Sequence, residues 1–226
     1  MTTDLYQLNE PSPIVSADID APPPPDDASV AYGDTPAVFD DWSTTATSLA
    51  VWRREPSFDI AQHLAKMQLS LLTGWRRSFG AAEAETAIAE AMANSGFNNA
   101  ALENFLAADM ALLTRVFSTS TGIERVEARL DIIRHNACRR FHVDSYPARL
   151  AVTYVGPGTD WVPRCRSEQA LAEQEDYTGP AIEFPAFSVG LFAGAMNGRT
   201  GLVHRSPKIE GTGRARLFLC VNAARN

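Results

Sequence analysis

The chain has 226 residues, of which 45% are hydrophobic and 21% charged, and its net charge is −7. This composition is that of a globular domain with a sizeable core. The negative net charge argues against a broad nucleic-acid-binding face, which needs clustered lysine and arginine. No apolar run reaches the length of a membrane span, and the first residues lack the basic and apolar regions of a secretory signal.

The three cysteines, Cys138, Cys165 and Cys220, do not have the spacing of a disulfide framework. A sparse, odd number of cysteines indicates free thiols in a reducing compartment. We therefore expect a cytoplasmic protein, with no nucleic acid and no membrane as a partner.

Residues 1–45 are predicted to form a disordered N-terminal tail. The segment APPPPDD at 21–27 is a polyproline run followed by acids, and the hydrophobic residues around it are scattered. The remainder, residues 46–226, is predicted to form a single domain.

Helical periodicity dominates the chain between about 58 and 119. Apolar residues recur there at steps of three and four, namely Ile60, Leu64, Met67, Leu71 and Trp75. A stretch rich in Ala and Glu follows and ends at Gly96, a typical helix stop. The same periodicity returns from about residue 99. We predict three helices in this region.

After Gly122 the apolar period changes to two, which is typical of half-buried strands. Strand-like segments follow between about 123 and 222, namely VEARLDI, ARLAVTYV, FSVGLFAG, GLVHRSP and RARLFLCVN. The predicted fold is α+β, with an N-terminal helical layer packed on a double-stranded β-helix core of the jelly-roll or cupin-like type. The helices are expected to cover one face of this core, and a homodimer interface is the alternative.

His142 and Asp144 are the first candidate functional residues. In an extended segment residues i and i+2 share a face, so an imidazole and a carboxylate converge there. Three interpretations are open: a metal site, an acid/base pair, or a polar edge strand. A second strand histidine, His204, favours the metal site. Two histidines and one carboxylate form the facial triad of non-heme Fe(II) oxygenases.

Two arginines, Arg214 and Arg216, follow His204 by ten and twelve positions. An oxygenase that uses 2-oxoglutarate needs a cation for the far carboxylate, and the planar fork of arginine suits that role. Arg216 is the preferred anchor, because it leads directly into an apolar strand, and Arg214 is the alternative.

Cys138 offers a competing chemistry, because a thiolate is a good zinc ligand. Together Cys138, His142, Asp144 and His204 would make a closed set of four ligands. Such a set points to structural or stored zinc. The other interpretation is that Cys138 is a small buried residue.

The segments CRRFHVDSYPARLAVTYVGPGTDW (138–161), GLVHRSP and RLFLCV resemble an uncharacterised bacterial family, domain of unknown function 1826. The resemblance covers about residues 50–222. The family name implies no activity, although the location of its genes near genes of zinc homeostasis supports the zinc hypothesis.

More distantly, the HxD…H…R pattern is similar to the jelly-roll Fe(II)/2-oxoglutarate oxygenases. That resemblance implies metal ligation by His142, Asp144 and His204, with Arg216 or Arg214 as co-substrate anchor. The functional hypotheses are thus a dioxygenase acting on a small molecule or a protein side chain, a non-catalytic zinc protein, and a metal-free interaction module.

Overall fold

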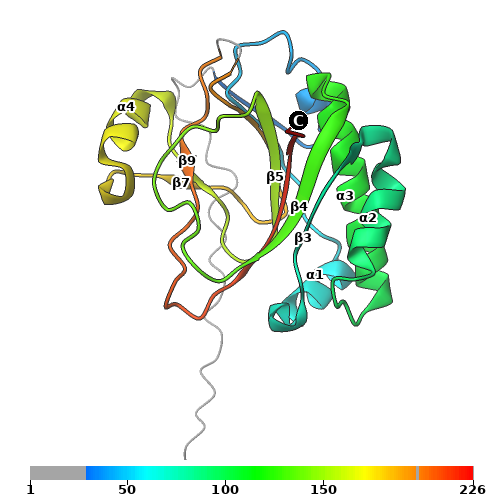
Figure 1. Cartoon of the computed structure of the whole chain (residues 1–226). Coiled ribbons are helices and arrows are strands. Elements are labelled where there is room, and N and C mark those ends of the chain that lie inside the picture. The colour runs from blue at the N-terminus through cyan, green and yellow to red at the C-terminus, as the bar shows by residue number, and fades with distance from the viewer. Residues whose placement is uncertain (1–28, 197–198, 226) are drawn as a thin grey trace, which may run out of the picture.

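Two β-sheets face each other at the centre of the molecule (Figure 1). The computed structural model describes residues 29–196 and 199–225. The large sheet has seven strands in the order β1-β2-β8-β5-β10-β4-β3, and the small sheet has the order β7-β6-β9. Neighbouring strands are antiparallel except for the parallel pair β1–β2.

The large-sheet strands are β1 Val30–Gly33, β2 Leu49–Trp52, β3 Trp75–Gly80, β4 Arg125–Ile133, β5 Ala148–Val155, β8 Val189–Ala193 and β10 Arg216–Ala223. The small-sheet strands are β6 Asp160–Trp161, β7 Ile182–Glu183 and β9 His204–Arg205.

Helices cover the outside of both sheets. They are α1 Phe58–Ala65, α2 Ala84–Met92, α3 Ala100–Thr121 and α4 Arg164–Glu173, with short 3-10 turns η1 Pro36–Phe39, η2 Leu69–Leu71, η3 Ala81–Glu83 and η4 Gln174–Asp176. The long helix α3 begins where the Asn99 side chain accepts a hydrogen bond from the Leu102 backbone N–H. It ends at Gly122, whose φ of +73° is left-handed. None of the helices in the described part of the chain is long and apolar enough to cross a membrane.

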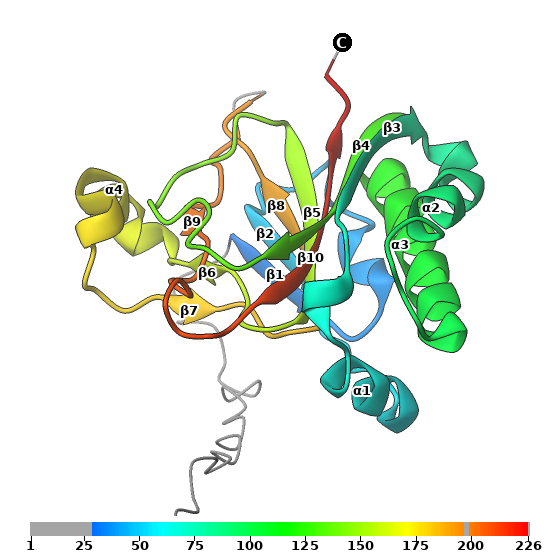
Figure 2. The same cartoon turned by 60° about the horizontal axis from the view of Figure 1, so that its bottom comes forward.

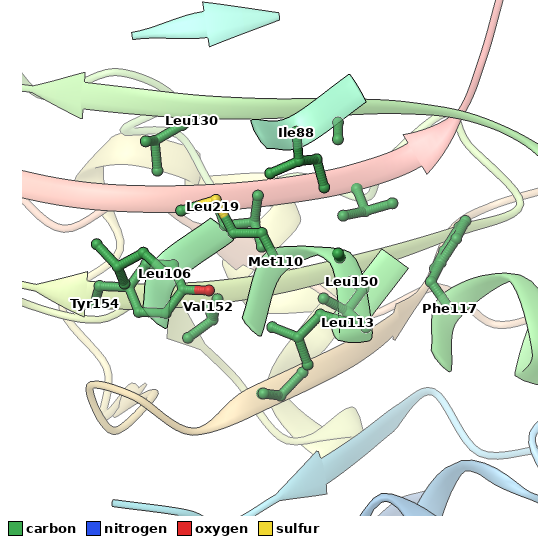
Figure 3. Close-up of a cluster of buried hydrophobic side chains, with 14 of the residues drawn as sticks. Ile88, Leu106, Met110, Leu113, Phe117, Leu130, Leu150, Val152, Tyr154 and Leu219 are labelled. Carbon is green, nitrogen blue, oxygen red and sulfur yellow. The ribbon is translucent and has the colours of Figure 1, made fainter. Parts of the chain in front are cut away.

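The main core lies between the large sheet and the helices α2 and α3 (Figure 3). In Figure 3 Leu106 and Met110 of α3 meet Leu130 of β4, Val152 of β5 and Leu219 of β10. All five are buried. Burial of this apolar surface fixes the helical layer on the outer face of the sheet.

The inner face of the large sheet packs against the small sheet. Phe192 of β8 and Phe218 of β10 meet Trp161 of β6 in a second buried cluster. A third cluster lies between the small sheet and α4, where Ala170 is fully buried. The space between the two sheets is therefore where side chains from distant parts of the chain converge.

The predicted helical stretch 58–119 is interrupted by a strand. Trp75, expected on a helical stripe, is instead the first residue of β3 and pairs with Leu130 of β4. Gly74 permits this close approach, because a Cβ there would lie 2.5 Å from the Leu130 carbonyl oxygen. The spacing of three to four that suggested one helix is shared between α1, the turn η2 and the start of β3.

The predicted boundary of the N-terminal tail at residue 45 is also wrong. Residues 30–45 contain β1 and η1, and Phe39 and Trp42 are buried against the main core. Parallel pairing of β1 with β2 ties this segment to the sheet edge. The polyproline run lies outside the described residues.

Candidate metal centre

His142 and His204 face each other across an antiparallel β-bridge. Each backbone N–H donates to the carbonyl of the other residue, both at 3.0 Å. Directly opposed residues on antiparallel strands project to the same side, and the two imidazole centroids are 4.6 Å apart. His204 is the first residue of β9 and points into the space between the sheets, beside the ring of Phe192 at 5.3 Å.

Both imidazoles are oriented in the same way. Nδ1 of His142 lies 2.8 Å from the carbonyl oxygen of Arg140, and Nδ1 of His204 lies 3.0 Å from that of Leu202. A carbonyl can only accept, so each Nδ1 carries the proton in the neutral ring. Each Nε2 then presents a lone pair, which is the usual state of a metal-binding histidine.

Asp144 completes the cluster. Its Oδ1 forms an ion pair with Nη1 of Arg149 at 3.0 Å, and its Oδ2 lies 3.6 Å from Nε2 of His204. Nε2 of His142 is 3.8 Å from Oδ1. The three candidate ligand atoms all lie within 4.8 Å of one another. Among the described residues, Oδ2 of Asp144 is buried and has no hydrogen-bond partner. This oxygen therefore has lone pairs available for a metal ion.

These distances favour a cation over an acid/base pair. Separations of 3.6 and 3.8 Å between histidine nitrogens and Asp144 are too long for hydrogen bonds. Ligand atoms about 2.1 Å from one ion lie roughly 3–3.5 Å apart, and the two histidine–carboxylate separations are close to that spacing. Burial lowers the pKa of His204 from 6.5 to about 4, so this residue is neutral and able to ligate at neutral pH. His142 and Arg149 lower this pKa further, and Asp144 opposes them.

Arg216 and Arg214 occupy different environments. Arg216, the first residue of β10, is 1% exposed and donates to the hydroxyl oxygens of Thr153 and Thr159 at 3.0 and 3.2 Å. Its Nε has no hydrogen-bond partner, and no carboxylate lies within ion-pair distance of it, among the residues that the structure describes. Arg214 is instead exposed in the turn before the strand. Burial lowers the pKa of Arg216 to about 10, with Asp160 and Glu183 opposing, so it remains charged at neutral pH.

Cys138 does not join the cluster. It is an exposed free thiol, and its sulfur is absent from the group of ligand atoms formed by the two histidines and Asp144. The interpretation of Cys138 as a small buried residue is also wrong. The closed four-ligand zinc set therefore has no support. Cys138 does line the cavity onto which the two histidines open, which has a volume of about 810 Å³.

Sequence reasoning missed Arg149, Thr153 and Thr159. Arg149 holds Asp144 and also donates through Nε to Oδ1 of Asn222 at 2.9 Å. The three missed residues lie on short stretches with no motif of their own. The one available signal for Arg149 and Thr153 is the alternation of side chains between the two faces of a strand. It places both residues of β5 on the inner face of the large sheet.

A family model described as "Protein of unknown function (DUF1826)" matches residues 33–222. The chain belongs to this family. The resemblance to DUF1826 seen in the sequence is confirmed, and the description of the family states no activity. No curated protein matches this DUF1826 chain.

Several solved structures are similar to this DUF1826 protein. A Pseudomonas putida prolyl-4-hydroxylase is 18% identical over 84% of this chain and 94% of that chain, with a TM-score of 0.41. The Arabidopsis thaliana dioxygenase for auxin oxidation 1, in complex with 2-oxoglutarate, is 8% identical over 87% and 92%, with a TM-score of 0.46. A bsmA homolog from Methylobium petroleophilum is 13% identical over 82% and 91%, with a TM-score of 0.39. With TM-scores this low, these similarities carry no argument about function.

Proposed function

We propose that this protein is an Fe(II)- and 2-oxoglutarate-dependent oxygenase. Nε2 of His142, Nε2 of His204 and a carboxylate oxygen of Asp144 would hold the metal, and Arg216 would hold the far carboxylate of the co-substrate. One observation carries the proposal: three ligand atoms converge, two of them from histidines that line a large cavity, and lining residues of the same cavity contact a buried guanidinium that has no carboxylate partner among the described residues.

The ligand set fits an iron centre. Two imidazoles with free lone pairs and one carboxylate supply three ligands, which leaves coordination positions for a co-substrate. The cavity side of His142 is accessible, since this side chain is 33% exposed while that of His204 is 5% exposed. A closed zinc site would need a fourth protein ligand, and the exposed Cys138 thiol is not part of the cluster.

The surroundings of Arg216 fit a carboxylate. A buried guanidinium without an acidic partner is costly, and a bound carboxylate would compensate it. The hydroxyls of Thr153 and Thr159 already fix the plane of its fork. Thr159 and Phe218, which touch Arg216, both line the cavity, so a ligand in the cavity can approach this end.

Iron and 2-oxoglutarate supply the oxidative chemistry when bound. The residues of this chain would bind and orient the metal and the co-substrate and would exclude water from them. The Arg140 and Leu202 carbonyls fix the two imidazoles, and Arg149 fixes the Asp144 carboxylate. Phe192 and Phe218 supply apolar wall beside the histidines and Arg216, where water would otherwise weaken each charged contact. The two facing sheets that carry these residues are, in this proposal, the double-stranded β-helix expected from the sequence.

The test is turnover of 2-oxoglutarate to succinate with Fe(II), measured by NMR without added substrate and then with candidate substrates. Wild-type protein and the Cys138→Ser variant should both produce succinate, whereas His142→Ala and Asp144→Ala should not. Absence of turnover in the wild type, together with tight zinc that Cys138→Ser removes, would overturn the proposal.

A further inference from the structure

The cavity continues well beyond the metal centre. From His142 and His204 it runs along the inner face of β4 to β3 and to the residues just before β3. The small sheet has three strands and the large sheet seven, and the buried cluster between them ends at Ile133 of β4. Figure 2 shows β4 and β3 extending past the small sheet. The uncovered inner face of these two strands therefore forms the far wall of the cavity.

Arginines dominate the charged groups of this cavity. Its lining includes Arg76, Arg129, Arg134 and Arg149 but a single aspartate, Asp131. Arg149 is compensated by the metal-centre carboxylate. The remaining three lie at the far end, in a chain whose net charge is −7. This concentration of positive charge is local and is not a property of the whole chain.

Arg76 of β3 and Arg129 of β4 lie directly opposite each other in the strand register. Like charges in such a cross-strand pair repel and destabilise the sheet. Two acids lie nearby, with Glu127 3.8 Å from Nε of Arg76 and Asp131 3.1 Å from Nε of Arg129. Neither contact has the geometry of a hydrogen bond, so both arginines keep donors for a ligand.

One buried polar atom at this end has no partner, and it is a donor. Nε of Arg129 has no hydrogen-bond partner among the described residues, and Arg129 lines the cavity. A guanidinium cannot accept a hydrogen bond. Arg134 donates to the Leu69 carbonyl oxygen at 2.6 Å and has no acid within ion-pair distance in the described part of the chain. A complementary ligand must therefore be rich in acceptors and negatively charged.

We propose that the far end of the cavity is the substrate subsite, and that the substrate is a small molecule carrying a carboxylate or phosphate group held between Arg76 and Arg129. An oxyanion placed between the two guanidinium groups converts their repulsion into two charge-assisted contacts. The inference rests on the proposed oxygenase function, because it assigns the opposite end of the same molecule to the metal centre.

The strand register gives the approximate separation between Arg129 and Arg149, the residue that pairs with the metal-centre carboxylate. Arg149, which binds Asp144, pairs with Asn222 of β10, and Asn222 pairs with Glu127 of β4. Arg129 thus lies two strands across the sheet from Arg149 and two residues along it. With strands about 4.8 Å apart and a rise of about 3.4 Å per residue, that separation is roughly 12 Å between Cα atoms. The anionic group of the substrate should lie about a nanometre from the carbon that reacts.

Four eight-carbon probes test the charge requirement: octanoate, octyl phosphate, octan-1-ol and octylamine. Their binding is measured by calorimetry, without turnover, on protein loaded with Fe(II) and 2-oxoglutarate under anaerobic conditions. The variants are Arg76→Gln and Arg129→Gln. The matched control is Arg77→Gln, because Arg77 is the next residue of β3, is exposed and pairs with Ala128, whose side chain faces the helices.

At least one anionic probe should bind about ten-fold or more tightly than octan-1-ol and octylamine, as expected for contacts with charged donors. Arg76→Gln and Arg129→Gln should each remove that preference, and Arg77→Gln should keep it. Binding of octyl phosphate alone would identify a phosphate ester as the substrate class, and binding of octanoate alone would identify a carboxylic acid.

Equal binding of all four probes, or an equal loss in Arg77→Gln, would overturn the inference. If Arg129→Gln melts at a lower temperature than the wild type because Asp131 loses its partner, Arg76→Gln alone decides, since Arg76 is largely exposed. Substrate-free succinate formation, measured separately on the same variants, reports on the proposed function. Failure of turnover with arginine-dependent anion binding intact would reject the oxygenase and keep the anion subsite.

Discussion

His142 and His204 form a hydrogen-bonded pair, in which each residue donates its backbone N–H to the carbonyl of the other at 3.0 Å. This bridge connects the loop before β5 to the small sheet and brings the two imidazoles to one side. The geometry of the centre therefore depends on backbone pairing, which is more rigid than side-chain packing alone. The consequences can be measured at the proposed metal centre, at the proposed co-substrate anchor and in the stability of the fold.

Arg149→Met should weaken metal binding by about 10- to 100-fold, the usual effect of losing a group that orients a ligand. Arg149 holds Oδ1 of Asp144, and without it the carboxylate is free to rotate away from the histidines. Competition with a chromophoric chelator measures the affinity. Arg149→Lys should restore part of it. Arg53→Met is the control, because Arg53 pairs with the exposed Asp34. Unchanged metal affinity in Arg149→Met would show that Asp144 needs no such support.

Arg216→Gln should raise the 2-oxoglutarate concentration needed for half-maximal turnover by about 10- to 100-fold, since a hydrogen-bonded charged contact contributes about 1.5–3 kcal/mol. Arg214→Gln should leave that concentration within about two-fold of the wild type, because Arg214 is exposed in the turn before β10. Steady-state kinetics on both variants measure the difference. Equal effects of the two substitutions would remove Arg216 from its proposed role.

Metal-free protein should lose stability as the pH falls from about 6.5 towards 4. Burial holds the pKa of folded His204 at about 4, whereas an unfolded histidine takes up its proton near 6.5. The unfolded state binds more protons between these values, so lowering the pH favours unfolding. Urea midpoints at about pH 7 and about pH 5 measure this loss. His204→Gln should show a smaller loss than the wild type, and an identical loss would contradict the assignment.

Asp109 should matter more for stability than any exposed acid. It accepts from Arg54 and from the hydroxyl of Tyr154 at 2.7 Å, and it joins α3 to β5 beneath the helical layer. Asp109→Ala leaves Arg54 as a buried charge without compensation and should cost about 3–5 kcal/mol. Asp34→Ala, which breaks the exposed pair with Arg53, should cost about 0–1 kcal/mol. Urea unfolding measures both, and similar losses would refute this difference.

The sequence allowed the central pair to be named because of its spacing. His142 and Asp144 are two residues apart in an extended segment, and that spacing places both on one face. His204 could be added because its own segment is apolar and extended. The strand β3 was not predictable from periodicity, since Trp75 continued a helical spacing and its actual partner, Leu130, lies far downstream.

Contacts between side chains could not be predicted from the sequence. Arg149 touches Asp144 only because the turn before β5 folds back, and the register of β5 with β10 brings Asn222 to Arg149. The preference for Arg216 over Arg214 could be stated from the sequence, because Arg216 leads directly into an apolar strand, but its burial and its contacts with Thr153 and Thr159 could not.

The most direct test is anaerobic titration of 2-oxoglutarate into Fe(II)-loaded protein, followed by the charge-transfer absorption of the iron–keto-acid chelate. We expect a saturable band in the wild type, no band in Asp144→Ala, and a band that needs more 2-oxoglutarate in Arg216→Gln. A wild-type protein that binds Fe(II) without developing the band, or a band that survives Asp144→Ala, would contradict this expectation.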